Sequence, residues 1–89
     1  MTTLRTALNA ADTAREAYLG RCLVVWHELQ LIAPELAADI LALGFDEHAA
    51  ALWVCEPDRN GDSPASKVDA GCGTDVQLMI QRIMHGFVA

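Results

Sequence analysis

The stretch YLGRCLVVWHEL, residues 18–29, decides the fold because its apolar side chains fall on two sides of one helix. On each side they recur at three- and four-residue spacing, as in an amphipathic helix. The first stripe is Leu8, Tyr18, Cys22, Val25 and Leu29, and the second is Leu19, Leu23 and Trp26. A helix that is apolar on two sides is either central in a bundle or covered by a partner subunit.

The helical pattern extends over residues 4–32, as one long helix or as two shorter helices joined near Gly20. A chain of 89 residues has a small core, which cannot easily hide so much apolar surface. We therefore expect a homodimer formed by this helix. The expected interface residues are Tyr18, Cys22, Val25, Trp26 and Leu29.

Proline and glycine mark the two short helices that follow. Pro34 suits the first position of a helix, and Gly44 suits a left-handed cap at its end. Asp46 is a good N-cap for the next helix, which must end before Pro57.

Two further helix starts lie in the last third of the chain. Ser63 followed by Pro64 begins a short helix that Gly71 ends. Thr74 with Gln77 three residues later is a capping-box pattern. The closing helix should carry an apolar face made of Val76, Ile80, Ile83 and Phe87.

The chain is therefore predicted to be all-α, a small bundle of a long N-terminal helix and several short helices. It should form one compact domain, with a helical dimerisation segment at residues 1–45 and a partner-binding segment at residues 46–89.

Charge and hydropathy exclude two classes of partner. The chain has twelve acidic and six basic residues, a net charge of -6, and the basic residues are scattered. Nucleic-acid binding requires a clustered basic patch, so we expect none by this chain alone. The longest apolar run, CLVVW, is too short to span a bilayer, and the N-terminus lacks the apolar core of a signal peptide. We expect a cytoplasmic protein without membrane contact.

One loop has the spacing of a calcium site. Asp58, Asn60, Asp62 and Asp69 occupy positions 1, 3, 5 and 12 of such a loop, but Ser63 replaces the glycine required at position 6. The same residue types are typical of turns, which favours an exposed loop.

The cysteines and histidines lack the spacing of a metal site. They are Cys22, Cys55, Cys72, His27, His48 and His85. No two of them are spaced as zinc ligands usually are, and three cysteines are typical of reduced thiols. A thiol enzyme would use Cys72 with His85 or His48 as its base. The absence of other catalytic signals favours a protein that is not an enzyme and uses no metal or cofactor.

The C-terminal part of the chain, from Ala49, resembles the toxin-binding domain of Xre/MbcA/ParS-type antitoxins. Members of that family carry a Trp-Leu-x-x-Pro-Asn element, a Gly-x-(Ser/Thr)-Pro motif, a glycine turn and a last helix that ends at Gly-aromatic or Val-x-Ala. The matching residues are Trp53, Pro57, Gly61, Ser63, Pro64, Gly71, Val76, Ile80, Arg82, Ile83, Gly86 and Ala89. The segment before the match is too short and too acidic for the helix-turn-helix that those antitoxins usually carry.

The resemblance implies a non-enzymatic module that neutralises a RES-type toxin, an enzyme that acts on NAD, by inserting its C-terminal end into the toxin's active site. Arg82 and His85 would reach polar groups of that pocket, and Phe87 and Val88 would fill it. The expected partner-binding residues are Arg82, His85, Gly86, Phe87, Val88 and Ala89. Three alternatives stay open: a DNA-associated regulator, an adaptor for another enzyme, and a tail that folds back on the chain's own core.

Overall fold

The computed structural model describes residues 3–86, and within that range it consists of five helices without a strand. This confirms the all-α prediction. The elements are α1 (Leu4–Ile32), α2 (Pro34–Ala42), α3 (Glu47–Cys55), α4 (Pro64–Asp69) and α5 (Gly73–Met84). None of these helices is both long enough and apolar enough to cross a membrane.

Local capping signals place most of the helix ends as expected. α1 is one continuous helix through Gly20, so the single long helix is the correct alternative. The Asp46 side chain accepts a hydrogen bond from the Ala49 amide at 2.8 Å and starts α3. Ser63 caps α4 in the same way. Gly44 has a φ of 97°, the left-handed conformation that ends α2.

The predicted start of α5 is wrong. The helix begins at Gly73 with Cys72 as its N-cap, and no side chain makes the capping bond. Gln77 donates its amide instead to the Asp39 carboxylate of α2, at 2.8 Å. Because this bond is partly buried and its acceptor is charged, it is stronger than the reach back to Thr74 that a capping box requires.

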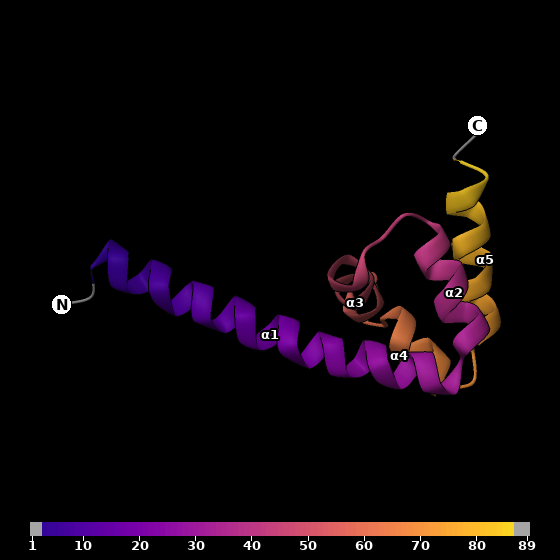
Figure 1. Cartoon of the computed structure of the whole chain (residues 1–89), viewed down its shortest axis with the longest axis horizontal. Helices are drawn as coiled ribbons and strands as arrows, with labels where there is room; N and C mark the ends of the chain where they lie inside the picture. The colour runs from indigo at the N-terminus through magenta and orange to yellow at the C-terminus, as the bar shows by residue number, and fades with distance from the viewer. Residues whose placement is uncertain (1–2, 87–89) are drawn as a thin grey trace.

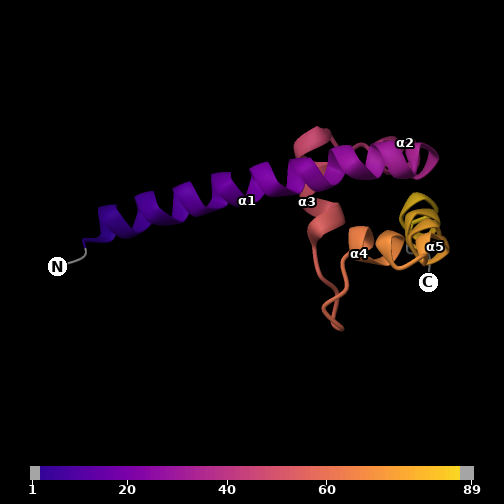
Figure 2. The same ribbon diagram turned by 90° about the horizontal axis from the view of Figure 1, so that it is seen from below.

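The core lies where the C-terminal half of α1 meets the four short helices. α1 packs most extensively on α3, which crosses it at a steep angle (Figures 1 and 2). Trp26 of α1 is fully buried, in one cluster with Ala50 and Ala51 of α3. Alanine has no side chain beyond Cβ, so these positions leave room for the indole. The cluster is Cys22, Trp26, Leu29, Leu36, Ala37, Ile40, Ala50, Ala51, Val54, Val76 and Ile80.

The N-terminal half of α1 extends beyond this core (Figure 1). Every residue from Leu4 to Tyr18 is exposed, and the radius of gyration is 15.5 Å. A compact domain of this length would have a radius of gyration of about 12 Å. The packed part, which we call the body, consists of residues 19–80. It joins the two segments divided at residue 45, because α1 contacts α3 and α2 contacts α5.

Neighbouring residues of α2 provide a test of the core. Ile40 is fully buried, whereas Leu41 is exposed. We expect Ile40→Ala to lower the free energy of unfolding by about 2–5 kcal/mol through lost burial and an opened cavity. Leu41→Ala should change it by less than about 1 kcal/mol. Urea unfolding followed by circular dichroism measures both, and equal losses would contradict this placement of the core.

Candidate functional site

The outer half of α5 is an exposed surface at the C-terminal end of the described chain. Val76 and Ile80 are fully buried and attach the helix to the body, whereas residues 81–86 are all exposed. α5 lies beside α2 and runs away from α1, so its last turns extend past the body (Figure 1). This places two of the expected partner-binding residues, Arg82 and His85, on a free helix end.

Arg82 and His85 share one side of α5 with Leu78, since residues spaced by three, four and seven positions lie on the same helix face. That side lies opposite the buried Val76 and Ile80. Leu78 and Met84 are exposed beside the arginine and the imidazole, and Ile83 is exposed on the opposite face. A charged group, an imidazole and apolar surface close together are typical of a protein-contact patch.

Gly86 ends the described chain in a left-handed conformation, with a φ of 71°. Its amide donates to the Ile83 carbonyl at 3.2 Å, which terminates α5 with a turn that suits glycine. Phe87, Val88 and Ala89 lie outside the described residues. Whether the tail inserts into a partner or packs on the core therefore stays a prediction, as does the role of Phe87 in the apolar face of α5.

The expected dimer interface needs a correction. Cys22, Trp26 and Leu29 are buried in the chain's own core, where α2 and α3 cover them. They are not available to a partner unless the body opens. Tyr18 and Val25 are exposed and remain available. Helical periodicity identified both apolar sides of α1 but did not show which of them the chain itself covers.

Neither Cys55 nor the Cys72–His85 pair is arranged for nucleophilic catalysis within residues 3–86. Burial, followed by a hydrogen bond with the Cys22 thiol, raises the pKa of Cys55 to about 12, so its thiol is neutral at physiological pH. The Cys72 thiol is exposed and lies 4.0 Å from the Ala70 carbonyl. His85 lies at the other end of α5, about 18 Å along the helix. The structure does not bring that pair together.

The loop with calcium-like spacing is held by its own first aspartate. Oδ1 of Asp58 accepts hydrogen bonds from the amides of Asn60 and Asp62, at 2.8 and 3.0 Å, and Oδ2 pairs with the Lys67 ammonium at 3.2 Å. These three donors lower the pKa of Asp58, with the two amides contributing most. The carboxylate thus stabilises an exposed turn, as the turn composition predicted. Across residues 3–86 no three acidic, histidine or cysteine side chains are grouped as metal ligands would be.

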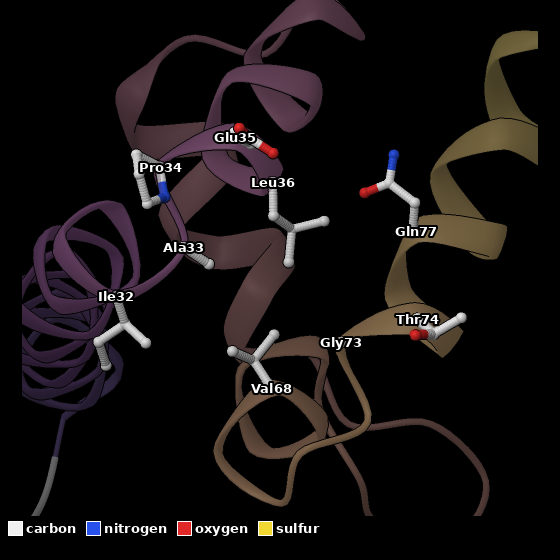
Figure 3. A pocket seen from close by; sticks show the side chains of 9 residues that line it. All are labelled: Ile32, Ala33, Pro34, Glu35, Leu36, Val68, Gly73, Thr74 and Gln77. Atoms are coloured by element: carbon white, nitrogen blue, oxygen red, sulfur yellow. The ribbon is translucent and has the colours of Figure 1, made fainter.

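A surface hollow that sequence reasoning missed lies between α1, α2, α4 and α5. It has a volume of about 550 Å³, and its lining combines apolar side chains with Glu35, Thr74 and Gln77 (Figure 3). Its edge at Ile32 is highly exposed. The signal in the sequence was the pair Leu31 and Ile32, which continue the apolar pattern of α1 up to Pro34, although nothing in the pattern indicates which helices form the opposite wall.

Comparison of the chain with protein-family models, curated proteins and solved structures found no match. The function must therefore be inferred from the surfaces described above.

The raised pKa of Cys55 has a measurable consequence. The unfolded thiol ionises near its ordinary pKa of 9.0, whereas the folded thiol keeps its proton to about 12. The stabilisation from the neutral thiol is therefore complete below pH 9 and is lost as pH rises from 9 toward 12. We expect the free energy of unfolding to decrease over that range. The decrease should be shallower in Cys55→Ala, and identical slopes in both proteins would contradict the assignment.

Proposed function

We propose that this chain is a non-enzymatic protein-binding module of antitoxin type, acting in the cytoplasm as a homodimer. It neutralises a RES-type, NAD-consuming toxin through the C-terminal end of α5 and the residues that follow. The observation that carries the proposal is the free end of α5, where Arg82, His85 and exposed apolar side chains precede the left-handed Gly86.

The physical support for the proposal is that the body leaves the apolar side chains at this end of α5 uncovered. Ile83 continues the buried face of Val76 and Ile80 along α5, yet it is exposed because the body ends before it. Keeping apolar side chains on a free helix end exposes them to water without benefit to the fold. A partner that covers them gains this burial. Arg82 adds a group enriched in the central contacts of protein interfaces.

An adaptor for another enzyme would use the same surface, so the identity of the partner is what an experiment must decide. The test uses a RES-type enzyme from the same source, whose NAD consumption is measured with increasing amounts of this protein. Inhibition at equimolar ratio is expected. NAD consumption unchanged at a large excess would contradict the toxin as partner.

A truncated chain that ends at Gly86 tests the contact itself. We expect loss of at least about 2 kcal/mol of binding free energy, as for removal of a central anchor, with an almost unchanged melting temperature. Arg82→Ala should weaken inhibition, and Arg5→Ala, an exposed arginine at the other end of the chain, is the matched control. A large fall in melting temperature with inhibition intact would show that the tail packs on the body.

A further inference from the structure

One side of α1 carries an exposed apolar residue at every seventh position. These residues are Leu4, Ala11, Tyr18, Val25 and Ile32, and we call them the heptad stripe. All five are exposed; Leu4 is 77% exposed, Tyr18 47% and Ile32 70%. A seven-residue apolar repeat drifts around a straight helix, and a second helix wound along it in a left-handed supercoil follows that drift. The stripe therefore has the period of a helix-pairing surface.

The C-terminal end of the heptad stripe lies in a groove between α1 and α4. The groove has a volume of about 330 Å³ and an apolar floor that includes Val25, Ile32 and Val68. Two exposed carboxylates, Glu28 and Asp69, border it. The N-terminal end of the stripe has no such wall, because that half of α1 extends beyond the body (Figure 1). The C-terminal half of α1 thus borders a groove. The N-terminal half, residues 4–17, lies beside no other helix, and we call it the bare half.

We propose that the heptad stripe binds a second copy of this chain, with the two α1 helices antiparallel and a two-fold axis at Tyr18. Tyr18 lies midway between Leu4 and Ile32, so the two-fold pairs each bare half with the groove of the partner. Both copies then use the same surface, as a self-complementary two-fold interface requires.

The shape of the bare half fits the groove. Between Leu4 and Tyr18 one border of this side carries the alanines at positions 7, 11 and 14, and the other border carries the exposed Leu8 and Arg15. Small side chains allow two helices to approach closely, so a bare half can lie beside α4 without displacing it. A parallel arrangement would instead place the two α4 helices against each other.

Charge favours the antiparallel arrangement as well. Residues 4–17 contain two arginines and two acidic residues, so the bare half is neutral and the net charge of -6 resides on the rest of the chain, where the body carries all ten remaining acidic residues. A parallel dimer would bring two acidic bodies together, which costs free energy. In the antiparallel dimer each acidic groove receives a neutral helix.

The size of the surface sets the expected strength. A 29-residue helix is about 43 Å long, so a strip about 10 Å wide covers about 430 Å² of each copy. Stable interfaces bury about 800 Å² per partner. The helices alone provide roughly half of that, and the groove walls add to it, which predicts a dimer that dissociates at micromolar concentrations.

This interface rests on the homodimer in the proposed function. It does not depend on whether the partner of α5 is a toxin. Sedimentation equilibrium of the full chain measures the dimer dissociation constant. Tyr18→Glu places two like charges at the two-fold axis and should raise this constant at least about 30-fold, the loss of a central contact. Leu31→Glu is the matched control, since Leu31 is 78% exposed and lies off the stripe. It should change the constant less than about 3-fold.

Leu4→Glu should also weaken the dimer. Because Leu4 lies outside the body, its replacement cannot disturb the core, so misfolding is excluded as the cause of the weaker dimer. A dimer unchanged by both Tyr18→Glu and Leu4→Glu overturns the stripe while leaving the homodimer in place. If the wild-type protein is still a monomer at about 0.1 mM, both the stripe and the homodimer are overturned. Neither result bears on inhibition of the toxin.

Disulfide trapping tests the orientation. In a Cys72→Ser background, chains with Leu4→Cys are mixed with chains with Ile32→Cys and oxidised. The antiparallel dimer predicts a crosslink between the two different chains. Crosslinks of Leu4→Cys chains with one another would show a parallel dimer and overturn the proposed geometry.

Discussion

The burial of Trp26 among the alanines of α3 is the constraint on which the rest of the structure depends. Ala50 and Ala51 are as fully buried as the indole, so α3 lies across α1 with little between the two backbones. This contact fixes the position of α3, and through the Asp58 turn it fixes α4, which in turn contacts α5. It has a cost: the indole N–H has no hydrogen-bond partner within residues 3–86.

The same contact leaves two surfaces uncovered. Because α3 covers the side of α1 that carries Cys22, Trp26 and Leu29, the neighbouring heptad stripe faces solvent. Because the buried Val76 and Ile80 and the Gln77–Asp39 hydrogen bond attach α5 to the body before residue 81, its last turns extend past the body. The stripe runs along α1, whereas the last turns of α5 point away from α1 (Figure 1), so a second copy on α1 and a different partner on α5 can bind at once. A small domain can serve as a binding module in this way because its core occupies only its centre.

How much of this could be predicted from the sequence depended on the range of the interactions. The helix starts at Asp46 and Ser63 were predictable because each cap bonds an amide three residues away. The start of α5 was not, because Gln77 bonds Asp39 of another helix. The pattern showed that α1 has two apolar sides, but the assignment of Cys22, Trp26 and Leu29 to a partner was wrong, since only the tertiary packing determines which side the chain covers. The hollow at Ile32 requires four helices, and the apolar pair Leu31 and Ile32 indicated only the part that α1 contributes.

Hydrogen exchange of the α1 amides tests the central claim most directly, namely that the core ends near Cys22 and the rest of the helix depends on a second copy. A helical segment of about 14 residues without packing is marginally stable. At a concentration where sedimentation shows a monomer, the amides of residues 8–17 should exchange rapidly, while those of residues 24–30 are protected by the core. Protection of residues 8–17 should appear as the dimer forms. Equal protection of both segments in the monomer would contradict the account.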